Sequence, residues 1–330
     1  MSVPLSILDL APVGRGQTPS DSFAASVAIA QRAEELGYQR IWYAEHHNIR
    51  SIASSATAVL IAHVGAHTEK IRLGAGGIML PNHSPLVIAE QFGTLAAMYP
   101  GRIDLGLGRA PGSDQATTYA LRRDPRTSER FPQDVLELQA FLAGESRVQG
   151  VDAFPGKGSN VPLYILGSSL FGAKLAAALG LPYAFASHFA PDALVDAITA
   201  YRSEFQPSEQ LEQPYVIAGV NVTAADTSQA AREQFQAIRR ARAVSLFGRR
   251  LGLPQDLSDE QADELLASAV GMHVDQMLRY AAVGDPGEVR DFLDGFVKET
   301  GADELITVHQ APSLEPRLRS VALLAEAMAG

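Results

Sequence analysis

Short apolar runs alternate along the chain with longer segments in which apolar residues recur every three or four positions. The short runs are typical of buried strands, and the longer segments are typical of amphipathic helices. The first strand is expected at residues 5–11, and the helix after it has clear boundary signals. Thr18, Pro19 and Asp21 predict an N-cap with a capping box. Gly37 predicts the end of this helix.

The same pattern repeats until eight strands are expected, each followed by a helix. This alternation predicts parallel strands joined by helical crossovers. Eight such units in 330 residues favour a closed (β/α)8 TIM barrel over an open doubly wound sheet. We expect one domain, residues 1–330, with longer insertions after the fourth and seventh strands. The expected strands are residues 5–11, 40–46, 71–80, 102–109, 161–167, 182–187, 214–224 and 304–309.

Composition narrows the class of protein. The apolar fraction of 46% and the charged fraction of 19% suit a soluble globular protein. The net charge of -10 argues against nucleic acid as the main partner. The absence of cysteine excludes disulfides, thiolate metal sites and cysteine nucleophiles. The chain has neither a signal-peptide pattern nor an apolar stretch of the ~20 residues that cross a bilayer, so we expect a cytoplasmic protein without membrane contact.

Ionisable residues and glycines gather where the expected strands end. In a (β/α)8 barrel the functional residues lie at the C-terminal ends of the strands. We therefore expect binding and chemistry at this rim. Its residues are Asp9, Leu10, Ala11, Glu45, His46, His47, Gly74, Gly76, Gly77, Gly106, Gly108, Arg109, Gly167, Ser168, Ser169, Ser187, His188, His309 and Gln310.

The second strand ends in Glu45, His46 and His47. Consecutive strand residues point to opposite faces, so the two imidazoles cannot bind one metal ion from a regular strand. The H-E-x-x-H spacing of zinc hydrolases is also missing, and we expect no metal site. Two interpretations remain open. The histidines are satisfied by neighbours at a polar strand end, or one imidazole faces the pocket as a hydrogen-bond donor or base.

Glycines interrupt the third and fourth strands. The segment GLGRAPG, residues 106–112, has the composition of a dinucleotide-binding loop, but it lies outside the first strand–helix unit and does not open directly into a helix. Gly74, Gly76 and Gly77 lie within a strand, where glycine is unfavourable unless a ligand or a backbone comes close. A flat ring at the barrel mouth and a tight bend of the barrel explain these three glycines equally well.

The fifth strand runs through Ser168 and Ser169 directly into a helix. Backbone N–H groups at a helix start, together with two hydroxyls, can bind an anion. Ordinary N-capping is the alternative. Arg109 and Arg130 could add charge and bidentate hydrogen bonds suited to a phosphate.

Four segments resemble the bacterial luciferase-like flavin-dependent monooxygenases, in the order that this family has them. They are LDLAPV, AEHHN, IRLGAGGIMLPNHSPLVIAEQFGTLAAMYPGRIDLGLGRAPG and LGSSLFGAKLAAALGLP. The third segment, residues 71–112, is the most specific. The resemblance runs from the first strand through the helix after the fifth, and it implies the same (β/α)8 barrel that the strand count predicts.

The resemblance also implies roles for individual residues. His46 matches the family's pocket histidine, which acts beside the flavin, and is the implied catalytic residue. Gly76 and Gly77 match a position where the family carries a non-proline cis peptide next to the flavin ring. The implied cofactor-binding residues are Asp9, Leu10, Ala11, Gly76 and Gly77 at the ring, and Arg109, Arg130, Gly167, Ser168, Ser169, Leu170, Phe171 and Gly172 at the phosphate.

The sequence departs from the light-emitting members of the family at two positions. Gly108 stands where luciferases carry a reactive cysteine, which argues against luminescence from long-chain aldehydes. Gly172 stands where the family has a threonine, which leaves the phosphate to backbone and serine donors.

The activity that the resemblance implies is an FMN-dependent monooxygenase. A separate reductase would supply reduced FMN, which would react with O₂ to a C4a-(hydro)peroxyflavin and oxygenate a small organic substrate. A homodimer is implied as well. Two alternatives stay open: an oxidoreductase of the same fold that transfers hydride with the deazaflavin F420, and a flavin-binding protein without turnover.

Overall fold

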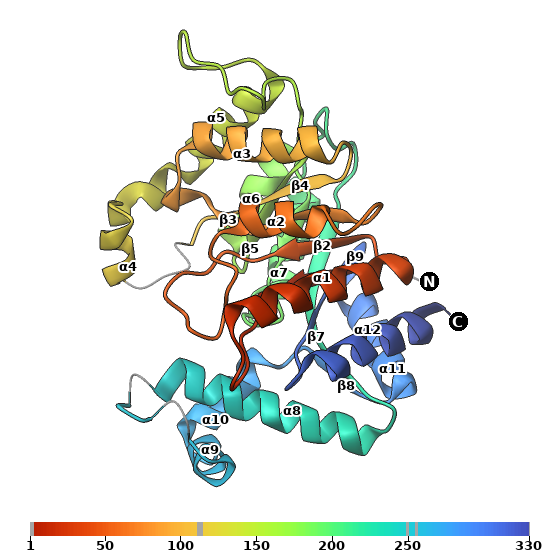
Figure 1. Ribbon diagram of the computed structural model, residues 1–330. Helices are drawn as coiled ribbons and strands as arrows, with labels where there is room; N and C mark the ends of the chain where they lie inside the picture. Colours follow the sequence, from red (N-terminus) through yellow and green to blue (C-terminus); the bar gives the residue numbers. More distant parts are fainter. Residues whose placement is uncertain (1–2, 111–114, 249–250, 255–256, 330) are drawn as a thin grey trace.

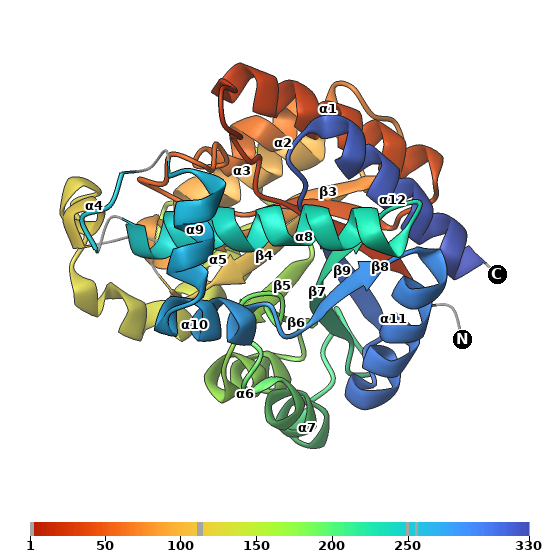
Figure 2. The ribbon, with the colours of Figure 1, turned by 90° about the horizontal axis from the view of Figure 1, so that it is seen from below.

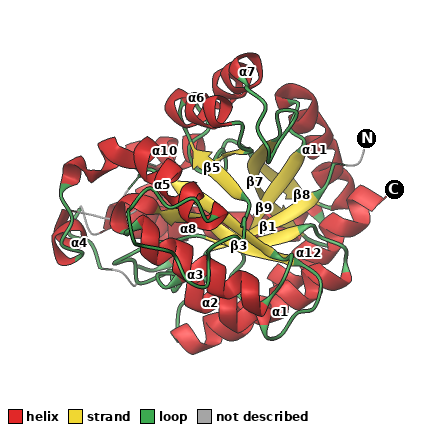
Figure 3. Ribbon diagram, turned by 90° about the horizontal axis from the view of Figure 1, so that it is seen from above, coloured by secondary structure: helices red, strands yellow, loops and turns green. Residues whose placement is uncertain are grey.

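Parallel strands form the centre of the molecule, inside a ring of helices (Figure 3). The structure is a computed structural model that describes residues 3–110, 115–248, 251–254 and 257–329. In that part of the chain, eight strands close into a barrel in which each pairs with its neighbours in parallel, which confirms the predicted fold. They are β1 (Leu5–Asp9), β2 (Arg40–Tyr43), β3 (Arg72–Met79), β4 (Ile103–Gly108), β5 (Leu163–Gly167), β6 (Tyr183–Phe185), β7 (Val216–Ala224) and β9 (Glu304–His309).

A ninth strand, β8 (Ala281–Gly284), pairs with β7 outside the closed ring. The sequence pattern did not predict it. Its four residues are Ala-Ala-Val-Gly, a run that is too short to show alternation and contains a single β-branched residue. The expected eighth barrel strand is β9, which pairs with β1 and β7.

The barrel helices lie around the strands in sequence order (Figure 1). Thr18 and Asp21 form the predicted capping box at the start of the first helix, and Gly37 has the positive φ expected after its end. No helix among the described residues has the length and apolar character needed to span a membrane. The barrel helices are α1 (Pro19–Glu35), α2 (Thr57–Gly65), α3 (Pro85–Met98), α5 (Phe131–Ala143), α6 (Leu170–Leu179), α7 (Leu194–Glu204), α11 (Pro286–Thr300) and α12 (Leu314–Ala329).

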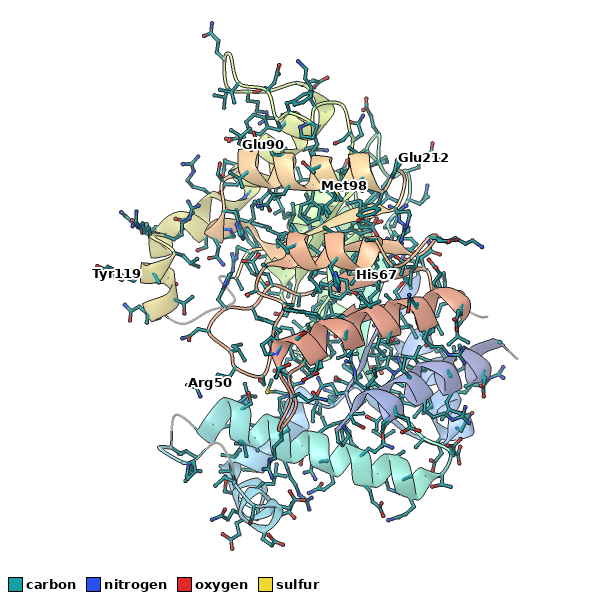
Figure 4. All side chains as sticks on the ribbon, viewed as in Figure 1. Arg50, His67, Glu90, Met98, Tyr119 and Glu212 are labelled. Atoms are coloured by element: carbon teal, nitrogen blue, oxygen red, sulfur yellow. The ribbon has the colours of Figure 1, made fainter. Side chains whose placement is uncertain are left out.

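Two insertions carry the remaining helices. After β4 come α4 (Gln115–Ala120) and a 3-10 helix (Pro125–Arg130). Another short 3-10 helix (Leu80–Asn82) follows β3, outside the two insertions. Tyr119 of α4 is 86% exposed and projects away from the barrel (Figure 4). Pro111 and Gly112, which end the GLGRAPG motif, lie outside the described residues.

The second insertion follows β7 and lies in front of the barrel strands in Figure 2. It contains α8 (Ser228–Ala243), α9 (Asp259–Leu266) and α10 (Ala269–Met277). Helix α8 ends at Ala243, and a π-helical turn (Val244–Gly248) continues it. The apolar periodicity of the sequence does not distinguish these two helix types over one turn.

Side chains of each strand alternate between two apolar cores. In β2, Ile41 and Tyr43 pack against the surrounding helices, whereas Trp42 faces the barrel interior. Ala44 continues the interior face just beyond the strand. The interior core is Leu8, Trp42, Ala44, Tyr164, Ala184, Ile217, Ile306 and Val308.

Charged side chains close the N-terminal end of the barrel interior. Arg40 donates to Glu304 through Nε at 2.9 Å and to Asp104 through Nη1 at 2.8 Å. All three side chains are buried. Buried charges are tolerated when they are paired and hydrogen-bonded. The further donors to the two carboxylates are Ser6, Trp42, Arg72 and Tyr215.

Arg40→Met is therefore expected to lower the free energy of unfolding by about 3–5 kcal/mol, because it leaves two buried carboxylates without their shared cation. Urea unfolding followed by circular dichroism measures this loss. Arg126→Ala, which breaks an exposed pair with Asp124, is the control and leaves the midpoint unchanged. Equal midpoints for Arg40→Met and the wild type would show that the buried cluster contributes nothing to stability.

Candidate functional site

A cavity of about 1100 Å³ opens at the C-terminal ends of the barrel strands. Pockets for drug-sized ligands measure about 300–1,000 Å³, so this cavity has room for a large cofactor and a second molecule. Strand ends form its base, and the loop after β1 and the start of α12 form part of its rim. Helix α8 closes one side with Ala237, Ile238, Ala241 and Arg242.

His46 lines this cavity, whereas Glu45 and His47 do not. β2 ends at Tyr43, but its alternation continues beyond the strand, so that Trp42, Ala44 and His46 face the interior and the residues between them face outward. Glu45 is buried behind the rim and accepts hydrogen bonds from His47 Nε2 at 2.8 Å and His83 Nε2 at 2.9 Å. The three adjacent polar residues of the sequence thus divide between a cavity-facing imidazole and a supporting pair.

Glu45, which follows β2, also holds the end of β3 in place. Its Oε2 accepts the backbone N–H of Met79 at 3.0 Å, so one carboxylate joins the ends of β2 and β3. Burial alone raises the pKa of the Glu45 carboxyl, but the hydrogen bonds from His47, His83 and Met79 outweigh it and hold that pKa at about 2. The hydrogen bond to Glu45 raises the pKa of His47. Among the described residues, no group of His, Asp and Glu side chains could hold a metal ion.

The glycines of β3 have two different explanations. A Cβ on Gly74 would lie 2.8 Å from Cδ1 of Trp42, and a Cβ on Gly76 would lie 2.8 Å from Cδ1 of Leu8, so packing in the barrel interior requires both glycines. Gly76 and Gly77 also line the cavity, and the peptide bond between them is cis, as the resemblance implied. A Cβ on Gly77 would lie 2.8 Å from the carbonyl oxygen of Gly106, so packing against β4 requires this glycine as well. Gly76 and Gly77 thus meet a packing requirement and also line the cavity, whereas Gly74 meets the packing requirement alone.

The Asp9 carboxylate is occupied by protein donors. Its Oδ1 accepts from Arg317 Nη2 at 3.0 Å and from the Ala11 N–H at 2.9 Å, and its Oδ2 accepts from Ser26 at 2.7 Å. Ser26 lies on α1 and Arg317 on α12, so this carboxylate ties β1 to the two helices outside it. Asp9 belongs to the cavity lining, but its side chain has no free oxygen to offer a ligand.

Helix α6 begins at the cavity with unused donors. Ser169 is its N-cap residue, but the Ser169 side chain makes no capping hydrogen bond, so ordinary N-capping does not explain this serine. The backbone N–H groups of the first turn have no partners within the helix. Arg109 lies over the ring of Phe171, with its guanidinium carbon 4.1 Å from the ring centroid. Arg109, Ser168, Ser169 and Gly172 all line the cavity.

Three of the implied cofactor residues lie elsewhere. Ala11, Arg130 and Leu170 are not among the residues that line the cavity. The Arg130 side chain is 71% exposed, and its Nη2 lies 3.8 Å from Asp134. The implied residues that do line the cavity are Asp9, Leu10, Gly76, Gly77, Arg109, Gly167, Ser168, Ser169, Phe171 and Gly172.

The cavity wall includes His188, which belongs to the rim expected from the sequence, and Arg242, which the sequence patterns missed. Burial lowers the pKa of His188 to about 3, and the positive charges of Arg242 and His46 add to this effect, so the imidazole is neutral. Arg242 follows Ala237, Ile238 and Ala241 on the inner face of α8. An arginine that continues an apolar helical stripe was the sequence signal for it.

The Luciferase-like monooxygenase family profile matches residues 3–304. A relative named Luciferase-like monooxygenase, from Escherichia coli (strain K12), is 46% identical over 98% of this chain and 96% of its own. Another, named N-acetyl-S-alkylcysteine monooxygenase, from Bacillus subtilis (strain 168), is 36% identical over 79% of each chain.

Solved structures share the fold. The crystal structure of apo-MsnO8 covers 99% of this chain and 98% of its own, with 36% identity and a TM-score of 0.87. At 17% identity, two further structures show the fold alone. They are the oxygenating constituent of 3,6-diketocamphane monooxygenase from Pseudomonas putida in complex with FMN (TM-score 0.70, 99% and 97% coverage) and the F420-dependent tetrahydromethanopterin reductase of Methanopyrus kandleri (TM-score 0.69, 99% and 98% coverage). The profile matches most of the chain, and the Escherichia coli relative is similar over nearly its whole length. This chain therefore belongs to the luciferase-like monooxygenase family.

Proposed function

We propose that this protein is a monooxygenase that uses reduced FMN and O₂ to oxygenate a small organic substrate. One oxygen atom of O₂ goes to the substrate, the other leaves as water, and reduced FMN supplies the two electrons. The observation that carries the proposal is the unused donor set at the start of α6, beside Arg109, on the wall of a cavity large enough for a flavin. Helix N-termini favour phosphates in this way.

The residues present fit a flavin phosphate. Ser168 and Ser169 offer hydroxyls, and the first turn of α6 offers N–H groups. Arg109 has no carboxylate partner among the described residues, and Phe171 holds its guanidinium plane beside the helix. In the proposed site these groups hold the FMN phosphate. Arg130 contributes little there, because it is mostly exposed and lies beside Asp134.

The remaining cavity fits the ring. Gly76 and Gly77 carry no side chains, so a flat ring can approach their backbone, and Leu10 provides an apolar contact from β1. When bound, reduced FMN supplies the electrons and the site at which O₂ reacts. The barrel mouth and α8 shield this region from water, which protects a reactive oxygen species from side reactions.

In this proposal His46 moves a proton at the reacting oxygen, because it is the imidazole that β2 directs into the cavity. Glu45 acts through His46 by fixing the strand end next to it, with His47 and His83 as its donors. A separate reductase supplies the reduced flavin. A homodimer would cover Val59 of α2 and Met98 of α3, which are 70% and 52% exposed.

Removal of the Arg109 guanidinium tests the phosphate site. Arg109→Ala is expected to weaken FMN binding by about 10- to 100-fold, because charge-assisted hydrogen bonds contribute about 1.5–3 kcal/mol. Riboflavin, which lacks the phosphate, should bind the variant and the wild type equally. Flavin fluorescence titration measures both affinities, and Arg126→Ala is the control. A parallel loss of riboflavin affinity would place Arg109 at the ring or show that the variant has lost its fold.

The choice of cofactor is tested by comparing the affinities of the protein for FMN and for F420. FMN is expected to bind the wild-type protein more tightly than F420, because the segments AEHHN and PNHSP resemble the FMN-dependent members. Titration of the protein with each cofactor gives the two dissociation constants. Tighter binding of F420 would replace the oxygenase by the hydride-transfer alternative.

The role of His46 is tested with N-acetyl-S-ethylcysteine, a substrate chosen from the name of the Bacillus subtilis relative. His46→Ala is expected to lower the yield of ¹⁸O-labelled product from ¹⁸O₂ by about 10²- to 10⁴-fold, the usual contribution of proton transfer. FMN affinity should stay unchanged, and His63→Ala on the outer helix α2 is the control. Wild-type yield from His46→Ala would assign the proton to another group, and tight FMN binding without product from any tested substrate would favour the flavin-binding alternative.

A further inference from the structure

Two guanidinium groups that line the cavity have neither an ion pair nor a hydrogen bond to the protein within the described residues. Six charged side chains line the cavity, and four of them are already engaged. Asp9 pairs with Arg317, Asp21 closes the capping box of α1, and Arg15 donates to the carbonyl of Leu257. The other two are Arg109 and Arg242, and within the described residues neither lies in an ion pair.

Two other arginines of α8, close to Arg242 in the sequence, form ion pairs. Arg239 pairs with Asp275 at 2.7 Å, and Arg240 pairs with Asp263 at 2.6 Å. Both of these bridges face α9 and α10. Arg242 instead turns to the cavity, where it is half-buried, and burial lowers its pKa without any acidic group to oppose the effect.

An uncompensated, half-buried cation is unfavourable unless a ligand supplies the negative charge. Arginine is suited to this task because its planar fork binds carboxylates through two parallel hydrogen bonds. The cavity surface beside Arg242 is mostly apolar: Ala237, Ile238 and Ala241 of α8 and Leu246 of the π-helical turn line it, with Ser245 as its polar member. The wall therefore combines one anion-binding group with an apolar strip.

The flavin phosphate does not need Arg242. The proposed phosphate site has its own cation in Arg109, together with the start of α6. Arg242 lies instead near His188 and His46, since its charge and that of His46 both act on the His188 imidazole. His188 is neutral, and its buried Nδ1 has no partner, so it does not compete as a cation.

We propose that Arg242 binds the carboxylate of the substrate and that the substrate class is small organic acids with an apolar chain. The carboxylate lies against Arg242, and the apolar chain lies along the α8 strip toward His46. This inference rests on the proposed function, because it identifies the class of substrate that shares the cavity with FMN. It makes Arg242 a residue that determines specificity, and it gives no role to Arg242 in binding FMN.

The test compares acids with their neutral amides on protein loaded with oxidised FMN. The probes are N-acetyl-S-ethylcysteine and octanoate, each paired with its own primary amide, and isothermal calorimetry measures their affinities. Wild-type protein should bind at least one acid about 10- to 100-fold more tightly than the matching amide. Arg242→Gln should abolish this preference and leave amide binding unchanged, and Arg242→Lys should retain part of it.

Arg232→Gln is the matched control, since Arg232 lies on the same helix with an exposed side chain, 3.8 Å from Glu288. It should keep the full preference for acids. No preference for either acid in the wild type, or an unchanged preference in Arg242→Gln, overturns the inference. A loss of FMN affinity but not of riboflavin affinity in Arg242→Gln also overturns it, because Arg242 would then belong to the phosphate site.

The same measurements separate this inference from the proposed function. Failure of the wild type to bind FMN contradicts the flavin oxygenase, whereas calorimetry on the protein without FMN still reports whether Arg242 selects acids. Binding of FMN with equal affinities for acids and amides contradicts the inference alone.

Discussion

The alternation of side chains along a β-strand is the constraint on which this molecule depends. In β2 it sends Arg40 into the ion cluster at the base of the barrel, Trp42 into the interior core, and His46 into the cavity at the mouth. The intervening residues meet the helices instead. A shift of the β2 register by one residue would turn His46 away from the cavity and turn Glu45 into it. Stability and site geometry are therefore set by the same register.

Interactions behind the cavity keep this register at the strand ends. Glu45 joins the ends of β2 and β3 through His47, His83 and the Met79 N–H. Asp9 joins the end of β1 to α1 and α12 through Ser26 and Arg317. Glu45 lies behind the cavity wall, and Asp9 lines the cavity with both carboxylate oxygens engaged by protein donors, so both carboxylates position the backbone and side chains around them. The polar residues of the rim thus divide into those that face a ligand and those that hold the rim in place.

Much of the architecture could be predicted from sequence, because eight apolar runs with helical crossovers leave few alternatives. The position of His46 followed from the alternation that continues beyond β2, and the same alternation along β1 puts the Asp9 side chain on the face of Ile7, toward α1 and α12. Strand β8 could not be predicted, because four small residues carry no periodic signal. The apolar stripe of α8 indicates which face of the helix Arg242 shares, but its place in the cavity could not be predicted, since the approach of α8 to the barrel mouth is a tertiary contact that the local pattern does not contain.

In the proposed site, one cavity holds FMN with its phosphate at Arg109 and the start of α6 and with its ring at Gly76 and Gly77. A crystal structure of the protein grown with FMN is the decisive measurement. We expect phosphate oxygens within hydrogen-bond distance of Arg109 and Ser169, with His46 beside the ring and open volume left toward Arg242. A phosphate bound at Arg242, or a ring outside the barrel mouth, would contradict this proposal.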